Sequence, residues 1–389
     1  MPMALRFRGL AWVLLLCTLS ACSSSPEPAP PSTSTLEVEL TEVLTIGLET
    51  HDGDLLGAPA ALVTGQEGQM FVADRSIPAV RVFDADGQWQ HDIGKRGEGP
   101  VEFTSLNQLT LIGPDTLLAV DGMAMRATVV TTSGVAVDHW PLVTIEGGSL
   151  VILSALKHLD ERHLVVGWNT VSNNPADDHP TEVLHYVRRT DEGYHIEQQF
   201  LDPAEAYDFE GYGRSARPTG SALLLDDTTL LFAHQLYTGR IESFIYDEDS
   251  GAWTQEAPWP GVVSTETPYE NVPDEAYPGP NISRAGSPAG LFHARIFNRS
   301  AGLVTLPDER IAHFTRIKVD GEEQFGMELF ERSGERVGYA AIWRRPYREE
   351  PTSLPYVDHV DDDGRLYLRT NDEATGAPVV QVLQLSVSE

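Results

Sequence analysis

The stretch EGQMFVADRSIPAVRVFDADGQWQHDI, residues 67–93, is followed by a second copy of the same pattern, PDTLLAVDGMAMRATVVTTSGVAVDHW, at residues 114–140. In both copies an apolar run ends in aspartate, a second apolar run follows, and a turn with glycine leads into a third. Short apolar runs bounded by Asp and Gly are typical of strands joined by hairpins. The aspartate lies 13 residues before the turn glycine in each copy: Asp74 and Gly87, then Asp121 and Gly134. Two copies at one spacing predict a structural repeat.

Four weaker copies begin near residues 160, 226, 307 and 361, and one more apolar run precedes each of the six copies. Each unit therefore supplies four strands. The hairpin turns carry glycines, which tolerate positive φ: Gly87, Gly134, Gly193, Gly251 and Gly334. Six four-stranded units predict an all-β fold, a six-bladed β-propeller.

The sixth unit contains only three strands before Glu389. A strand predicted near residues 36–48 precedes the first unit and has no partner there. We expect this N-terminal strand to complete the last blade and close the ring, because an unpaired sheet edge promotes aggregation.

The first unit, residues 68–103, resembles an NHL-type repeat through V-A-D, then V-R-V-F-D-A-D-G, then a glycine-rich segment ending in phenylalanine. The resemblance is good in the first unit, fair in the second and faint in the others. More broadly, the chain resembles the six-bladed propeller lipoproteins of bacteria. This resemblance implies a fold and a location in the cell envelope, and it implies no reaction.

The N-terminus predicts export and lipidation. Residues 1–21 combine a basic start with a short apolar run, as in a signal peptide, and Leu19–Cys22 resembles a lipobox, which implies a lipid on Cys22. An ordinary secretory signal is the alternative. By the same resemblance, Ser23 implies the outer membrane. Residues 22–35 predict a polar, proline-rich tether, and residues 36–389 a single propeller domain.

The charge limits the range of partners. Asp and Glu number 58 against 27 Lys and Arg, a formal net charge of −31. Such a field repels nucleic acid and anionic lipid surfaces, so we expect no nucleic-acid partner and a membrane partner only through the lipid on Cys22. Outside Cys22, the chain after the signal peptide contains no cysteine, so it has no disulfides.

The segment Gly94–Phe103 has the composition of a phosphate-binding loop. A phosphate loop, however, requires a helix that begins directly after it, and the next run, LNQLTLI, predicts a strand. The segment is therefore interpreted as the connector between the first two blades.

Long loops on one face of the propeller contain much of the scarce positive charge, and loops on a rigid scaffold often bind ligands. Candidate ligand-binding residues are Lys95, Arg96, Trp168, Arg214, Arg217, Arg295 and Arg345. An anionic small molecule or an envelope protein would fit this composition. The competing interpretation pairs these cations with acidic residues in the same loops.

Asp74, Asp121, Trp168, His234, Thr315 and Thr370 are predicted to end the second strands of the six blades. Asp74, Asp121 and His234 could hold a divalent metal there, as the resemblance to propeller lactonases and the NHL-type lyase implies. The alternative is that both aspartates accept hydrogen bonds from loop amides. No other cofactor is predicted.

The sequence contains no G-x-S-x-G motif, and no catalytic residue is assigned. These observations favour a non-enzymatic, lipid-anchored envelope propeller that binds a protein or a small anionic ligand through its loop-rich face. The alternative function is a metal-dependent hydrolase or lyase with its site at the channel mouth.

Overall fold

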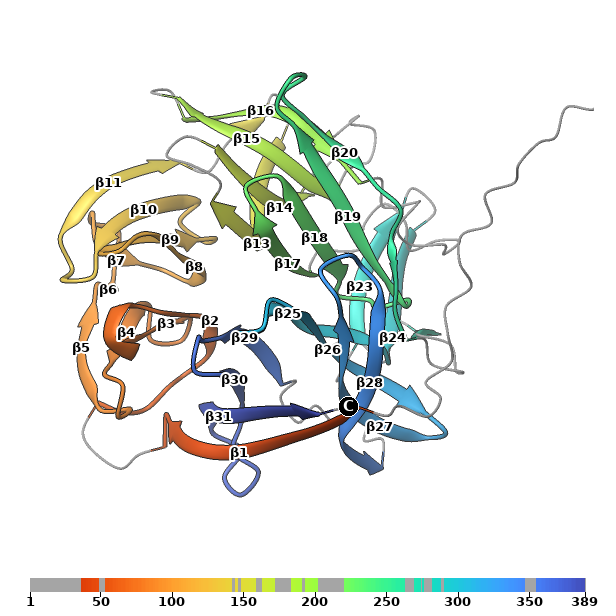
Figure 1. The fold of residues 1–389 in the computed structure, drawn as a ribbon. Coiled ribbons are helices and arrows are strands. Elements are labelled where there is room, and N and C mark those ends of the chain that lie inside the picture. The colour runs from red at the N-terminus through yellow and green to blue at the C-terminus, as the bar shows by residue number, and fades with distance from the viewer. Residues whose placement is uncertain are drawn as a thin grey trace, which may run out of the picture.

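The computed structural model describes residues 36–48, 53–141, 144–145, 148–158, 163–171, 183–190, 193–201, 220–262, 269–273, 275, 282–287, 290–346 and 355–388. Their strands form a ring of six antiparallel sheets, each built on four strands (Figure 1). The predicted six-bladed propeller is therefore confirmed. The predicted signal peptide and tether, residues 1–35, lie outside the described residues.

Within blades 1 to 5 the strands follow one another outward from the centre of the ring. Blade 1 contains β2 (Pro59–Thr64), β3 (Met70–Asp74), β4 (Ala79–Phe83) and β5 (Trp89–Ile93). Blade 2 contains β8 (Leu106–Gly113), β9 (Thr116–Asp121), β10 (Arg126–Thr131) and β11 (Ala136–Pro141). Blade 3 contains β13 (Gly148–His158), β14 (His163–Val171), β15 (Leu184–Thr190) and β16 (Gly193–Phe200), extended by β12 (Thr144–Ile145).

Blade 4 contains β17 (Gly220–Asp226), β18 (Thr229–His234), β19 (Arg240–Asp247) and β20 (Ala252–Gln255), and β21 (Trp259–Pro260) also pairs with β19. Blade 5 contains β25 (Arg299–Thr305), β26 (Ile311–Val319), β27 (Glu322–Phe330) and β28 (Arg336–Pro346). Blade 6 contains β29 (Tyr356–Val360), β30 (Arg365–Asn371) and β31 (Pro378–Ser388). The chain that links blade 4 to blade 5 forms a separate sheet, which contains β22 (Tyr269–Val272), β23 (Ile282–Ser287) and β24 (Gly290–Ile296).

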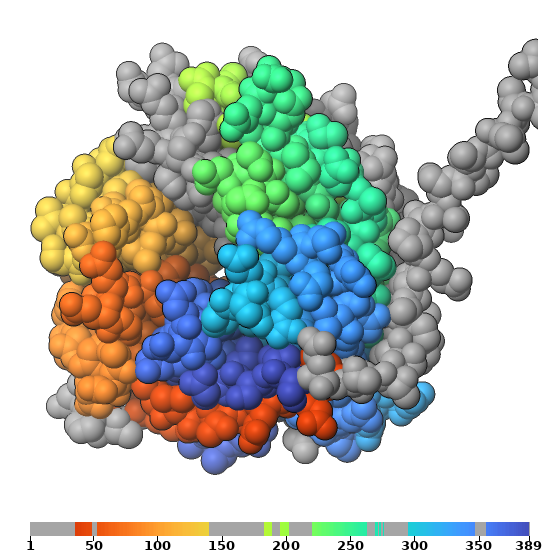
Figure 2. Space-filling model, in the orientation of Figure 1, coloured from red at the N-terminus to blue at the C-terminus, as the bar shows by residue number. Residues whose placement is uncertain are grey.

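The N-terminal strand closes the ring, as predicted. Strand β1 (Glu37–Ile46) pairs antiparallel with β31, from Glu37 opposite Ser388 to Ile46 opposite Val380. The innermost strands β2, β8, β13, β17, β25 and β29 each contact the next, and β29 contacts β2. Figure 2 shows a narrow opening at the centre of the packed ring.

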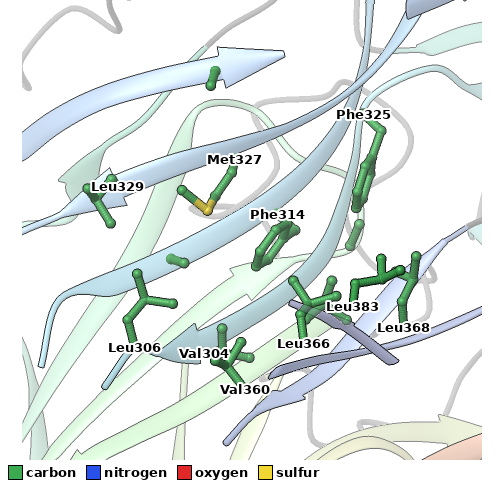
Figure 3. Close-up of a cluster of buried hydrophobic side chains, with 14 of the residues drawn as sticks. Val304, Leu306, Phe314, Phe325, Met327, Leu329, Val360, Leu366, Leu368 and Leu383 are labelled. Carbon is green, nitrogen blue, oxygen red and sulfur yellow. The ribbon is translucent and has the colours of Figure 1, made fainter. Parts of the chain in front are cut away.

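The hydrophobic core lies between neighbouring blades. Figure 3 shows the contact between blades 5 and 6, where Phe314, Phe325 and Met327 pack against Leu366 and other blade 6 side chains. These side chains are almost fully buried, and such burial contributes about 1.5–3 kcal/mol for each large apolar residue.

The predicted turn glycines have the expected conformation where φ is resolved. Gly87, Gly134, Gly251 and Gly334 have φ of 78°, 88°, 69° and 88°. Gly193, the fifth, is the first residue of β16. Positive φ carries little steric cost for glycine, so these residues fix the hairpins that separate one strand from the next.

The segment Gly94–Phe103 is confirmed as a connector between blades. Its short strands β6 (Lys95–Arg96) and β7 (Glu102–Phe103) pair in parallel, and the next element is the strand β8. Gly94 has φ of 85°, and a Cβ there would lie 2.4 Å from the ring of Phe103. The glycine is therefore required by close packing against Phe103.

Candidate functional site

The segment Gly94–Phe103, which has the composition of a phosphate-binding loop, is occupied by the side chain of its own Glu102. Glu102 Oε2 accepts hydrogen bonds from the backbone N–H groups of Glu98 at 3.1 Å and Gly99 at 2.9 Å. Hydrogen bonds from Gly99 and Lys95 lower the pKa of Glu102. A carboxylate of this chain already occupies these two amides, so they offer no phosphate cradle.

Asp74 and Asp121 hold loops together, as the structural interpretation predicted. Asp74 is fully buried and accepts hydrogen bonds from the N–H groups of Gly57, Ala58, Ser76 and Ile77. Asp121 accepts the equivalent bonds from Thr104, Ser105, Met123 and Ala124. Each carboxylate thereby ties the start of an innermost strand to the loop after the second strand of the same blade.

His234 ends β18 and is buried. Burial, together with the positive charge of Arg240, lowers its pKa to about 3, so the imidazole is neutral at physiological pH. Among the described residues, no three or more His, Cys, Asp or Glu side chains are grouped so that they could hold a metal ion. Asp74, Asp121 and His234 thus do not form such a group.

Two of the predicted strand ends are wrong. Trp168 lies three residues before the end of β14, and Thr315 lies inside β26, which continues to Val319. The physical reason in blade 5 is the turn at Asp320 and Gly321, whose φ values are 52° and 78°. An Asp-Gly pair favours a two-residue hairpin, and it extends both strands beyond Thr315.

The candidate basic residues are spread over several elements, and the described ones mostly have partners. Lys95 lies 3.2 Å from Glu102, and Arg96 donates to the carbonyl of Ser76 at 3.3 Å. Trp168 lies in β14, and Arg214 and Arg217 lie outside the described residues.

The remaining two candidates form ion pairs. Arg295 in β24 lies 2.6 Å from Glu270. Arg345, near the end of the outermost strand β28, lies 3.1 Å from Glu323 and 4.5 Å from the ring centroid of Trp343. These contacts support the competing interpretation, in which acidic neighbours neutralise the basic residues.

A different cluster lies at the channel mouth, which we define as the end of the ring where the innermost strands begin. Three hydroxyl residues lie at the starts of the innermost strands of blades 4, 5 and 6. They are Ser221, the second residue of β17, Ser300, the second residue of β25, and Tyr356, the first residue of β29. Ser221 Oγ lies 2.9 Å from Ser300 Oγ and 3.1 Å from Tyr356 Oη. The ring geometry thus joins three hydroxyl groups that are far apart in the sequence.

A buried acid–base pair lies directly behind these hydroxyls. His313 Nε2 is 3.0 Å from Ser300 Oγ, and His313 Nδ1 is 2.7 Å from Glu328 Oε2. Both side chains are 0% exposed. Strand register explains the placement, because His313 is opposite Glu328 and Ser300 is opposite Thr315, which shares a face of β26 with His313.

Glu328 is held by two further donors. Tyr237 Oη donates to Glu328 Oε2 at 2.6 Å, and the N–H of Val262 donates to Oε1. Burial and the charge of Glu328 raise the pKa of Tyr237, so this phenol keeps its proton. The Glu328 carboxylate thus contacts three neighbours, His313, Tyr237 and the backbone of Val262.

Two guanidinium groups lie on the other side of the mouth. Arg369 is opposite Tyr356 in the sheet, with its guanidinium 4.7 Å from the Tyr356 ring centroid and its Nε 2.5 Å from Asp358 Oδ2. Its Nη1 donates to the carbonyl of Pro59, the first residue of β2, at 3.2 Å. Desolvation and the charge of Arg369 lower the pKa of Arg75, whereas the charge of Asp74 raises it.

Sequence reasoning missed this cluster, although a signal existed. The apolar runs that precede the fourth, fifth and sixth copies are SALLL, AGLVTL and PYVDHV, which begin at Ser221, Ala301 and Pro355. Ser221, Ser300 and Tyr356 each lie within one residue of these first positions. Polar residues where an apolar innermost strand begins are positioned to face the channel mouth.

Comparison with known proteins supports the fold. A family model described as a 6-bladed beta-propeller, DUF5128, matches residues 33–126. A search of curated protein sequences finds no significant match.

Solved structures with the same fold cover almost the whole chain. A member of the DUF4221 family from Bacteroides vulgatus is 12% identical with a TM-score of 0.59, covering 90% of this chain and 99% of its own. A Bacteroides fragilis protein described as exported is 10% identical with a TM-score of 0.53, covering 92% and 98%. Virginiamycin B lyase from Staphylococcus aureus is 11% identical with a TM-score of 0.45, covering 90% and 99%. At these identities the first two similarities show the fold alone, and the chain is a six-bladed β-propeller with a polar cluster at its channel mouth.

Proposed function

We propose that this protein is a lipid-anchored propeller of the bacterial cell envelope that binds a small anionic ligand at the channel mouth. The observation that carries the proposal is the presence of two arginines at the mouth, beside three hydroxyl groups. The backbone N–H of Arg75 donates to the carbonyl of Ala58, just before β2, and Arg369 donates to the carbonyl of Pro59. Asp358 pairs with Arg369, and the carboxylate of Asp74 is held by four amides. Burial and the charge of Arg369 lower the pKa of Arg75, so an anion bound at the mouth would offset the like charges of the two arginines.

The chemistry of the cluster specifies the ligand class. Guanidinium groups bind carboxylate or phosphate oxygens with charge-assisted hydrogen bonds, and hydroxyl groups add neutral donors and acceptors. A ligand with one anionic group and a polar group a few ångströms away would use both sides of the mouth. The overall charge of −31 slows the approach of any anion, so binding depends on this local pair.

The binding proposal is tested with Arg75→Gln in the full chain. Binding of a panel of small carboxylates and phosphates is measured by isothermal titration calorimetry. Loss of one charge-assisted hydrogen bond of about 1.5–3 kcal/mol should weaken the best ligand about 10- to 150-fold. Arg310→Gln is the matched control, because Arg310 pairs with Asp308 in the turn between β25 and β26, at the opposite end of the strands. Equal affinity of wild type and Arg75→Gln would contradict the proposal.

The anchor is a separate part of the proposal, supported by the lipobox-like Leu19–Cys22 and the polar segment after it. Within the described part of the chain, no helix is long and apolar enough to cross a membrane. Cys22→Ser should move the protein from the membrane fraction to the soluble fraction. A variant that stays with the membrane would overturn the lipid anchor.

A metal-dependent hydrolase or lyase is the alternative function. Elemental analysis of the purified full chain tests it, because that function requires stoichiometric bound metal.

A further inference from the structure

A continuous line of hydrogen bonds connects the channel mouth with the interface of blades 4 and 5. It runs from Tyr356 through Ser221 and Ser300 to His313 and Glu328, with heavy-atom distances of 3.1, 2.9, 3.0 and 2.7 Å. Tyr356 is half-buried, whereas the residues behind it are buried. The line therefore has one end at the channel mouth and one end in the protein interior.

The direction of every hydrogen bond follows from its inner end. An ionised Glu328 only accepts, so His313 carries its proton on Nδ1 and donates to it. His313 Nε2 then accepts from the Ser300 hydroxyl, Ser300 accepts from Ser221, and Ser221 accepts from Tyr356. All donors point inward, so a proton entering at Tyr356 can be passed along by shifting each hydroxyl proton by one bond.

The groups around both ends suit such a transfer. Glu328, Tyr237, Tyr339 and Arg336 surround the inner end, and burial together with the charge of Glu328 raises the pKa of both tyrosines, so neither gives up its proton. His313 is then the acceptor. Arg369 and Asp358 flank Tyr356 at the outer end. Burial raises the pKa of Tyr356, the hydrogen bond with Ser221 and the charge of Arg369 oppose that rise, and the charge of Asp358 adds to it.

We propose that the channel mouth is an acid–base site, in which Tyr356 removes a proton from a bound anionic substrate while its own proton moves through Ser221 and Ser300 to His313. This inference rests on the proposed anion binding, which positions the substrate beside Tyr356. The substrate class is a carboxylate- or phosphate-bearing molecule with a weakly acidic C–H or O–H group next to its anionic end.

The transfer balances without any further reactant. The substrate X–H bond breaks, an O–H bond forms on Tyr356, and the original Tyr356 proton goes to Ser221 as the Ser221 and Ser300 protons move one step inward. The last proton forms an N–H bond at His313 Nε2, which gives an imidazolium beside the Glu328 carboxylate. Return of the proton to the product completes the cycle, as in eliminations and enolisations.

We call the line of hydrogen bonds from Tyr356 through Ser221 and Ser300 to His313 the relay. It makes Tyr356 an unusually reactive nucleophile, and that reactivity can be measured without knowing the substrate. The probe is 4-(fluorosulfonyl)benzoate, applied to the full chain, with the modified residues mapped by peptide mass spectrometry. Tyr356 Oη forms the S–O bond, fluoride leaves to water, and the phenol proton passes along the relay to His313. We expect labelling of Tyr356 at least tenfold faster than that of Tyr246, which is also half-buried and contacts Tyr186 Oη instead of a relay.

Substitutions then separate the relay from anion binding. Ser300→Ala should slow labelling of Tyr356 about tenfold, and Ser300→Thr, which keeps the hydroxyl, should restore it. The neutral probe benzenesulfonyl fluoride should show the same loss in Ser300→Ala. Arg75→Gln should slow only the anionic probe, so a failure of anion binding leaves the relay result intact. Ser243→Ala, which removes a buried hydroxyl elsewhere in blade 4, is the matched control.

Several outcomes would overturn the relay. These are labelling of Ser300 instead of Tyr356, equal labelling of Tyr356 in wild type and Ser300→Ala, and labelling of Tyr356 no faster than that of Tyr246. The last comparison uses the wild-type chain alone, so it holds even if a variant fails to fold.

Discussion

The two faces of blade 5 are built from alternate residues of the same strands and differ in chemistry, because the face toward blade 4 adds a buried hydrogen-bonded network to its apolar cluster. Toward blade 6, Ala312 and Phe314 of β26 enter an apolar cluster with Met327 (Figure 3). Toward blade 4, the intervening residue His313 enters the hydrogen-bonded network of Glu328. The interface with blade 6 is apolar at these positions, whereas the interface with blade 4 combines an apolar cluster, which includes Phe330, with paired donors and acceptors.

The difference determines which substitutions destabilise each interface. An apolar interface loses stability when volume is removed, because a cavity remains. A polar buried network loses stability when a single atom changes its hydrogen-bonding role, even at constant volume. Substitutions that change one property at a time therefore distinguish the two faces.

The largest effect is expected on the apolar face. Phe314→Ala removes a fully buried ring and should lower the free energy of unfolding by about 3–5 kcal/mol. Chemical denaturation monitored by circular dichroism measures it. Met327→Leu, which roughly conserves volume, should cost less than about 1.5 kcal/mol. Similar losses in both variants would show that volume does not govern this face.

A pH effect is expected from the histidines that lie outside the blade 4–5 network. Burial lowers the pKa of His185 and His234 to about 3, below the unfolded value of 6.5. Between these values only the unfolded chain takes up the proton, so stability present above pH 6.5 falls by about 1.4 kcal/mol per pH unit for each histidine. His234→Phe should reduce the slope of unfolding free energy between pH 6 and 4 by that amount. An unchanged slope would show that His234 already binds a proton in the folded chain.

On the polar face, Glu328→Gln keeps the volume and changes one oxygen to an amide NH₂. The amide cannot accept from Val262 while also accepting from Tyr237 and His313, so one buried donor loses its partner. We expect a loss of about 1–3 kcal/mol, measured by the same denaturation. A neutral result would mean that the network adds nothing to stability beyond its packing.

The smallest effect is expected at Arg345, near the end of the outermost strand of blade 5. Arg345→Gln removes one partner of Glu323, which also pairs with Arg316. Because Arg345 is partly exposed, the loss should stay within about 1 kcal/mol. A larger loss of unfolding free energy would show that the ion pair of Arg345 with Glu323 stabilises the protein more than a surface ion pair should.

The sequence predicted the architecture well because its signals are local. Each hairpin is specified by a glycine or aspartate turn, and the unpaired strand near residues 36–48 required a partner, which β31 provides. The strand ends at Trp168 and Thr315 were misplaced because strand length depends on neighbouring strands and on the Asp320–Gly321 turn.

The channel-mouth cluster could not be predicted from these local signals. Ser221 and Tyr356 are 135 residues apart in the chain, and only closure of the ring brings their hydroxyls to 3.1 Å. The role of His313 could not be predicted either, because it depends on Glu328 in the next strand and Ser300 in the previous one. The sequence therefore predicts the strands, whereas the cluster depends on how the ring brings the blades together.

The pairing of β1 also places the two ends of this strand on opposite faces of the ring. Tyr356, Arg369, Val380 and Ile46 form one row of strand partners across blade 6, so Ile46 is level with the mouth. Glu37, at the start of β1, lies at the far end of the strand, about 30 Å away along its length. The chain therefore enters the propeller at the face opposite the mouth, and whatever precedes Glu37 is attached to the ring on the side away from the hydroxyl cluster.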